Sequence, residues 1–312
     1  MTFANVRRSH CNRSVIVGHL SIGLILLVSL TCTRIASAND DLICCGASEV
    51  FIIDPAQPNV KKWSWQAKDS PSIPTELRGS FRSTDDCKPF RDDLLLITSS
   101  GRGVALIERS TKKCLFMTVV RNAHSGCLLP QNQLAVAASY GADAIQFYDR
   151  KNEEIPAATV QEIELVGAHG TVWDAKRDCL WALGGEELVK VESDPEVTVD
   201  RRWSITARYK LPSSGGHDLS MAQTLQQLFV TTDTQVLKFD LAKQAFEPQT
   251  GFHDQIKIKS VDQHPETGRI VFHRASGENW WSDTIRFEDT SPITLAGERL
   301  YKIRWDNPIA QP

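Results

Sequence analysis

Three histidines follow one another along the chain at a nearly constant interval. His124, His169 and His217 stand 45 and 48 residues apart, and each follows a small residue. Neutral imidazole is a common ligand of transition metals and also titrates near neutral pH. If a repeated fold brings equivalent positions side by side, the three rings meet at one place. That place is predicted to bind a ligand, with one divalent metal ion held by the three histidines as a possible cofactor.

Charged residues occur at or beside the same phase of the chain. Asp86 and Lys259 occupy corresponding positions in other segments, and Asp218 directly follows His217. A carboxylate there would orient a metal-bound histidine or act as a base. The ammonium group of Lys259 would hold an anionic part of a ligand as a point charge. The predicted ligand-binding set is therefore His124, His169, His217, Asp218, Asp86 and Lys259.

The elements that would position these residues follow a weak repeat of about 45 residues. Its clearest mark is a short strand that ends in an acidic residue, at residues 50–54, 104–108, 145–149, 188–192, 236–240 and 284–288. The acidic residues are 54, 41, 43, 48 and 48 positions apart. A more apolar strand and a tight turn precede each copy, which indicates a hairpin with a strand buried on both faces. Helical periodicity of useful length is absent after residue 38.

Several strands per unit at this period are typical of a β-propeller blade. The sequence therefore predicts an all-β, six-bladed β-propeller over residues 39–312, with blades starting near 41, 86, 122, 168, 216 and 258. The first unit lacks an innermost strand, and residues 300–306 offer one. We expect this C-terminal strand to pair into the first blade and close the ring. A β-sandwich or a two-domain β protein is the alternative.

The histidines have a second interpretation within this fold. Gly216-His217 is similar to the Gly-His pair that connects blades in WD-repeat propellers. Each histidine could then tie a loop between blades to backbone carbonyls and bind nothing. His124, His169 and His217 are expected at one mouth of the axial channel under both interpretations.

Residues 1–38 are predicted to be a secretory signal peptide. Arg7, Arg8 and Arg13 precede an apolar run, and Ala36-Ser37-Ala38 forms an A-x-A cleavage pattern. An uncleaved anchor is the alternative, because the run is long enough to be marginal for a membrane span. A lipoprotein signal at Cys32 is weaker, since Thr31 stands where Gly, Ala or Ser is required. The protein is therefore expected to be exported, to the periplasm or the exterior, with no membrane association after cleavage.

Charge and cysteine content agree with an exported domain. Residues 39–312 hold 31 basic and 38 acidic residues, so nucleic acid is not expected as a partner. Six cysteines remain after residue 38, which permits disulfides in an oxidising compartment. Most of them lie in or beside apolar strands, where cysteine behaves as a small hydrophobe. Mostly free, buried thiols are predicted, with one bridge at most.

Several segments resemble an uncharacterised bacterial family of exported six-bladed propellers that carry a domain of unknown function. They include "LICCGASEVFIIDP", "LLLITSSGRGVALIER", "AHGTVWDAKRDCLWALGGEEL" and "ERLYKIRW", spread over about residues 41–306. The resemblance implies the propeller fold and export but no activity. More distantly, a histidine-lined channel resembles that of metal-dependent propeller lyases acting on uronate polysaccharides, which is an analogy of architecture alone.

Two functions are consistent with this sequence. The first is a non-catalytic binding or scaffold propeller that takes a small molecule, a glycan or a protein at the channel mouth. The second is a metal-assisted lyase or hydrolase acting on an acidic, carbohydrate-like ligand. No nucleophile elbow, phosphate-binding loop or zinc-protease motif occurs in the chain.

Overall fold

A computed structural model describes residues 39–151, 154–193, 202–252 and 255–309. The predicted signal peptide, residues 1–38, lies outside the described residues. No described helix is long and apolar enough to cross a membrane.

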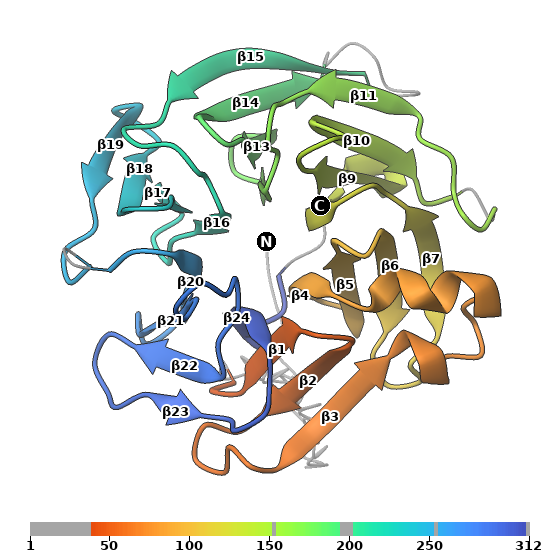
Figure 1. Ribbon diagram of the computed structural model, residues 1–312. Coiled ribbons are helices and arrows are strands. Elements are labelled where there is room, and N and C mark those ends of the chain that lie inside the picture. The colour runs from red at the N-terminus through yellow and green to blue at the C-terminus, as the bar shows by residue number, and fades with distance from the viewer. Residues whose placement is uncertain (1–38, 152–153, 194–201, 253–254, 310–312) are drawn as a thin grey trace, which may run out of the picture. The chain divides into compact units, whose positions relative to one another are not determined.

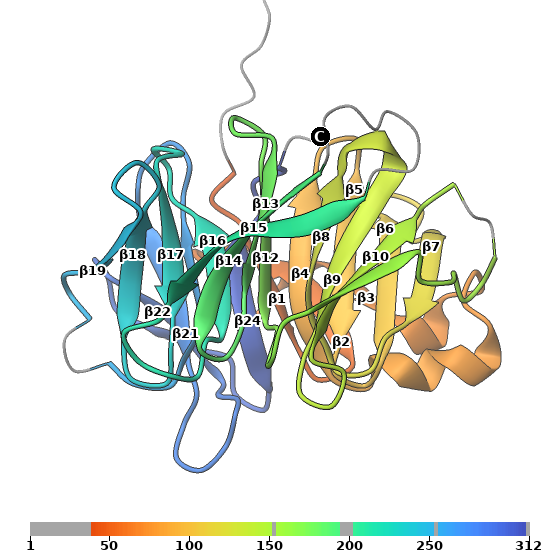
Figure 2. The same cartoon turned by 90° about the horizontal axis from the view of Figure 1, so that it is seen from above.

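Six four-stranded antiparallel sheets surround a central axis, which confirms the predicted six-bladed propeller (Figure 1). Seen from the side in Figure 2, the sheets stand around the axis as blades. From the inner strand outward, the first sheet consists of β24 (Leu300–Trp305), β1 (Leu42–Gly46), β2 (Glu49–Ile53) and β3 (Lys61–Gln66). The second sheet consists of β4 (Thr84–Phe90), β5 (Leu94–Ser99), β6 (Gly103–Glu108) and β7 (Cys114–Val119). The third sheet consists of β8 (Ala123–Leu129), β9 (Gln133–Ala138), β10 (Ala144–Asp149) and β11 (Gln161–Glu164). The others are β12 (Gly170–Asp174), β13 (Cys179–Leu183), β14 (Glu187–Ser193) and β15 (Trp203–Lys210); β16 (Asp218–Met221), β17 (Gln227–Thr231), β18 (Val236–Asp240) and β19 (Ala245–Pro248); β20 (Ile258–Gln263), β21 (Ile270–Arg274), β22 (Thr284–Phe287) and β23 (Ile293–Thr294).

The hydrophobic core lies between neighbouring blades rather than at one centre. The middle strands β5, β9 and β13 are buried along their whole length. One buried cluster joins Ile43 and Val50 of the first blade to Leu95 and Ala105 of the second. Burial on both faces explains why these strands are apolar throughout, since each face of a blade packs on a neighbour.

The C-terminal strand closes the ring, as the sequence predicted. β24 pairs antiparallel with β1, with Trp305 opposite Leu42 and Ile303 opposite Cys44. This pairing makes the last described strand the innermost strand of the first blade. The ring is thus held shut by backbone hydrogen bonds between β24 and β1, which cover the inner edge of β1.

One insertion separates the first two blades. The short helical turns η1 (Ala67–Asp69) and η2 (Thr75–Phe81) lie between β3 and β4, on the outer rim of the propeller (Figures 1 and 2). They account for the longest repeat interval, 54 residues. A third short turn, η3 (Pro130–Asn132), joins β8 to β9.

The six cysteines of the propeller are free and buried. Burial raises the pKa of the Cys114 and Cys179 thiols to about 12 and that of Cys127 to about 11. A thiolate is the reactive species, so these thiols are poor nucleophiles in the folded protein.

Thiol titration tests this arrangement. In the native 39–312 chain at pH 8, we expect less than about one equivalent of thiol per chain to react with a disulfide reagent. Burial suppresses both the access of the reagent and the formation of thiolate. Chemical denaturation should release the six thiols together. Rapid labelling of several thiols before unfolding would contradict the arrangement, and mass spectrometry of the unreduced protein checks for a disulfide directly.

Candidate functional site

A β-bulge recurs at the entrance of four inner strands. In β4, β8, β20 and β24 the pairing register with the next strand skips one residue, and the skipped residues are Asp85, His124, Lys259 and Tyr301. A bulge turns a side chain away from the regular alternation and is frequent beside active sites.

The other two inner strands have the same arrangement with a histidine. The backbone N–H of His169 donates to the carbonyl of Leu183, which already faces Gly170 in the ladder. His217 likewise donates to Thr231, opposite Asp218. The six blades therefore present one equivalent residue each at the same channel mouth. We call these six the entrance ring: Asp85, His124, His169, His217, Lys259 and Tyr301.

Contacts around the ring show that its members meet. The imidazoles of His124 and His169 stack with centroids 4.2 Å apart, and His217 meets His169 edge-on at 5.3 Å. The ring of Tyr301 lies 6.0 Å from that of His124. His124 Nδ1 is 3.2 Å from a carboxylate oxygen of Asp85. The prediction that the three histidines converge is thus consistent with the positions of their side chains.

His169 is held by its own loop. Its Nδ1 lies 2.7 Å from the carbonyl oxygen of Gly167, which can only accept, so Nδ1 carries the proton. Burial, together with His124 and His217, holds its pKa well below the usual value. This contact matches the interpretation in which a histidine ties a blade connection to a backbone carbonyl.

His217 has a different environment. Its Nε2 is 2.9 Å from Asp233 Oδ1 and 2.8 Å from Lys259 Nζ. Burial lowers the pKa of His217, although its hydrogen bond with Asp233 works in the opposite direction. The carboxylate of Asp233 has a lowered pKa because of the hydrogen bond from His217. His217 therefore contacts two charged side chains, whereas His169 contacts a loop carbonyl.

The geometry does not support a metal ion shared by His124, His169 and His217. A metal binds in the plane of an imidazole, along a nitrogen lone pair. The stacked planes of His124 and His169 differ by only 26°, so their lone pairs run nearly parallel and do not meet. Among the residues that the structure describes, no three His, Cys, Asp or Glu side chains are placed to hold a metal. The three-histidine metal site therefore stays a prediction that gains no support from this arrangement of the rings.

Asp86 and Asp218, the two carboxylates predicted to bind a ligand, are buried and paired inside the fold. Both lie one residue deeper than the entrance ring, and both are about 1% exposed. Arg304 of β24 donates to both carboxylates, with its closest contact at 2.7 Å from Nη2 to Asp218 Oδ1. Lys302 Nζ lies 3.0 Å from the same oxygen. Their negative charge is neutralised inside the fold and is not available to a ligand or a metal.

This buried ion cluster closes the channel below the ring. Burial alone would raise the pKa of Asp86 and Asp218, but the charges of Arg304 and Lys302 hold both values below the usual range. Lys88 of β4 donates to Ser125 Oγ and to backbone carbonyls of two other blades. A ligand at the entrance ring therefore meets a charged, hydrogen-bonded floor.

A groove adjoins the ring. It has a volume of about 830 Å³, and its lining includes Tyr140, Val166 and Asp233. Tyr140 is 56% exposed, and its ring meets the edge of His169 at 5.6 Å. Asp233 connects the groove to His217 through the hydrogen bond described above. The charged residues Glu186, Glu187, Arg208 and Lys210 complete its polar lining.

The sequence of residues 39–312 matches the model of a family of unknown function, DUF6528. The chain belongs to this family. The match spans the whole propeller, so the family and the fold coincide. No curated protein matches the chain.

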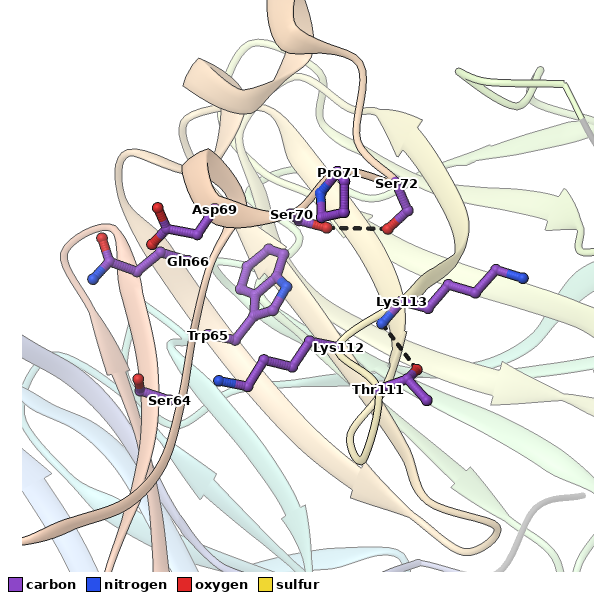
Figure 3. A pocket seen from close by; sticks show the side chains of 10 residues that line it. All are labelled: Ser64, Trp65, Gln66, Asp69, Ser70, Pro71, Ser72, Thr111, Lys112 and Lys113. Carbon is purple, nitrogen blue, oxygen red and sulfur yellow. Dashed lines mark hydrogen bonds between the residues drawn. The ribbon is translucent and has the colours of Figure 1, made fainter.

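This DUF6528 propeller has a second, smaller cavity at its outer rim. It measures about 310 Å³ and lies between β3, η1 and the turn that joins β6 to β7 (Figure 3). Two serine hydroxyls, those of Ser70 and Ser72, pair with each other at 3.0 Å within it. No residue of the entrance ring lines this cavity.

Sequence reasoning missed several residues around the ring. Tyr301 and Asp85 stand at the same phase of the repeat as the histidines. Only the bulge shows that their side chains, and not those of the adjacent residues, face the channel. Asp233 and Tyr140 come from the turns between the two middle strands of their blades, for which the repeat carries no signal. Trp280 is 45% exposed, and its ring centroid lies 5.5 Å from that of Tyr301.

Proposed function

We propose that this DUF6528 protein is an exported, non-catalytic binding propeller whose entrance ring and adjoining groove take a polar, carbohydrate-like ligand. The observation that supports this proposal most strongly is the entrance ring itself. Six blades each direct one side chain to the same mouth, and five of the six are ionisable Asp, His or Lys residues. A purely structural connection between blades would not require these side chains to meet.

The groove supports the choice of ligand. Its volume lies within the usual range of ligand sites, roughly 300–1,000 Å³. Exposed Tyr140 provides an aromatic face, and both acidic and basic side chains line the groove. Hydroxyl groups of a sugar both donate and accept hydrogen bonds, so they suit this mixture better than a ligand of one charge. Export is supported by the signal peptide predicted at residues 1–38 and by the resemblance to exported bacterial proteins.

The metal-assisted lyase or hydrolase has weaker support. It required His124, His169 and His217 to share an ion, and the first two rings are stacked. The charge that was expected to assist, on Asp86 and Asp218, is paired with Arg304.

An array of neutral and uronate-containing oligosaccharides tests the proposal. We expect wild-type protein to bind one class of glycan, and Tyr140→Ala and His124→Ala each to weaken that binding about tenfold or more, or about 1.4 kcal/mol. Isothermal titration with the best glycan measures this. Lys243→Ala, on an outer turn at 64% side-chain exposure, should bind like wild type. Absence of any glycan binding, or equal binding by the ring variants, would refute the proposal.

A further inference from the structure

Lys259 occupies an unusual position in the entrance ring. Its Nζ is 2.8 Å from His217 Nε2, and the same Nε2 is 2.9 Å from Asp233 Oδ1. A nucleophile within hydrogen-bond reach of a base, with a third group beside the base, is the recurring arrangement of activated nucleophiles. In this protein both partners contact the same imidazole nitrogen.

Nε2 of His217 can accept a proton from Lys259 or donate one to Asp233, but a single imidazole nitrogen cannot do both at once. When Lys259 is an ammonium ion, it donates to the lone pair on Nε2 of His217. When that proton passes to Nε2, the imidazolium N–H faces the carboxylate of Asp233, and Lys259 becomes a neutral amine. The carboxylate stabilises the positive charge that the histidine receives. His217 is therefore placed to relay the proton of Lys259 to solvent, because its lowered pKa keeps the imidazole from retaining that proton.

The surroundings of Lys259 favour the neutral amine. The residue is only 8% exposed, and burial lowers its pKa to about 8. Lys257 and Lys302 add positive charge nearby and act in the same direction, whereas Asp233 opposes them. His273, on the paired strand β21, is buried with a pKa lowered to about 3, so it adds no charge at neutral pH.

Lys259 differs in this respect from the other buried lysines of the channel. Lys88 donates to three oxygen atoms, and Lys302 faces Asp218 and Asp86 deeper in the fold. Lys259 lies at the mouth, where the side chains of His217 and Asp233 are 15% and 56% exposed. The groove that Asp233 lines adjoins this contact through the hydrogen bond between Asp233 and His217.

We propose that Lys259 forms a Schiff base with a small aldehyde or ketone bound at the entrance ring. The inference rests on the proposed function in that the ring must be open to a ligand. His217 relays one proton of the Lys259 ammonium group to solvent, and the free amine pair attacks the carbonyl carbon. The resulting carbinolamine loses its oxygen as water, so that amine and carbonyl give an imine and one water molecule. No oxidant or reductant takes part in this step.

Reductive trapping with glycolaldehyde and sodium cyanoborohydride tests the inference. The hydride reduces an imine to a stable secondary amine, which peptide mapping by mass spectrometry locates. At pH 7.5 we expect Lys259 of the 39–312 chain to be labelled at least about tenfold faster than exposed Lys176, because a larger fraction of its amine is neutral. Lys302, fully buried, should stay unlabelled and serves as the internal negative control.

Two variants separate activation from mere access. His217→Asn should slow labelling of Lys259 about tenfold and leave Lys176 unchanged, while circular dichroism verifies the fold. Lys259→Met should abolish the fast adduct. Labelling of Lys259 no faster than Lys176, or unchanged labelling in His217→Asn, overturns the inference. Glycan binding is measured in a separate experiment without glycolaldehyde. Normal glycan binding with no trapped adduct would refute the Schiff base alone. A trapped adduct with no glycan binding would refute the glycan ligand alone.

Discussion

Replacing Arg304 with alanine is expected to destabilise the propeller by about 3–5 kcal/mol. The guanidinium group makes four hydrogen bonds to Asp86 and Asp218, whose side chains are 1% exposed. Removing it leaves buried carboxylates without their main partner. Because the free energy of unfolding of such a domain is roughly 5–15 kcal/mol, this loss is a large part of its total stability. Urea unfolding monitored by tryptophan fluorescence measures the loss.

The matched control is an ion pair at the surface. Lys243 and Glu247 are 2.9 Å apart with side chains 64% and 52% exposed. Exposed pairs contribute about 0–1 kcal/mol, so Lys243→Ala should change little. The triple variant Asp86→Asn, Asp218→Asn, Arg304→Met should recover part of the lost stability, since it removes both unpaired carboxylates and leaves only Lys88 and Lys302 without an anionic partner. Equal stability of Arg304→Ala and Lys243→Ala would contradict the role of the buried cluster.

The same cluster fixes the sign of a pH effect. The pKa values of Asp86 and Asp218 are lower in the folded state than in an unfolded chain, because Arg304 and Lys302 lie beside them. Their contribution to stability is thus complete above the ordinary carboxyl pKa, about 4, and is lost as the pH falls below it. The stability difference between wild type and the triple variant should therefore shrink in acid.

Deleting residues 300–312 is expected to prevent folding. The deletion removes β24, which is the innermost strand of the first blade and carries Tyr301, Lys302 and Arg304. It exposes the edge of β1 along the channel and leaves Asp86 and Asp218 without their cations. We expect aggregated or unfolded protein by size-exclusion chromatography and circular dichroism.

A shorter deletion supplies the control. Ending the chain after Asn307 keeps β24 and removes the bridge between Phe90 and Ile309. This variant should fold with only a modest loss of stability. A folded, monomeric protein that lacks residues 300–312 would show that ring closure does not depend on β24.

Prediction from sequence succeeded where the signal was local and repeated. A strand that ends in an acidic residue recurs in six units, and its period alone indicated a six-bladed propeller. The missing inner strand of the first unit indicated closure by the C-terminus, which the pairing of β24 with β1 confirms. The insertion containing η1 and η2 was not predicted, since turns this short have no usable periodicity.

Prediction failed where one residue decides which way a side chain faces. Alternation along a strand sends neighbours to opposite sides, so a bulge at Asp85 exchanges the roles of Asp85 and Asp86. The same shift places His217 in the ring and Asp218 in the buried cluster. A repeat in the sequence locates the entrance of each blade, but not the bulge that selects the residue.

The sequence by itself determined the repeat, the blade number, the closing strand and the part of each unit that reaches the channel mouth. All of these follow from patterns within about 45 residues. Only the tertiary structure decided which side chains meet there and in what charge state. Arg304 lies 218 and 86 residues from its two carboxylate partners, and the stacking of His124 on His169 depends on the angle between blades. Contacts across the axis join blades that share no local pattern, so their geometry exists only in the closed ring.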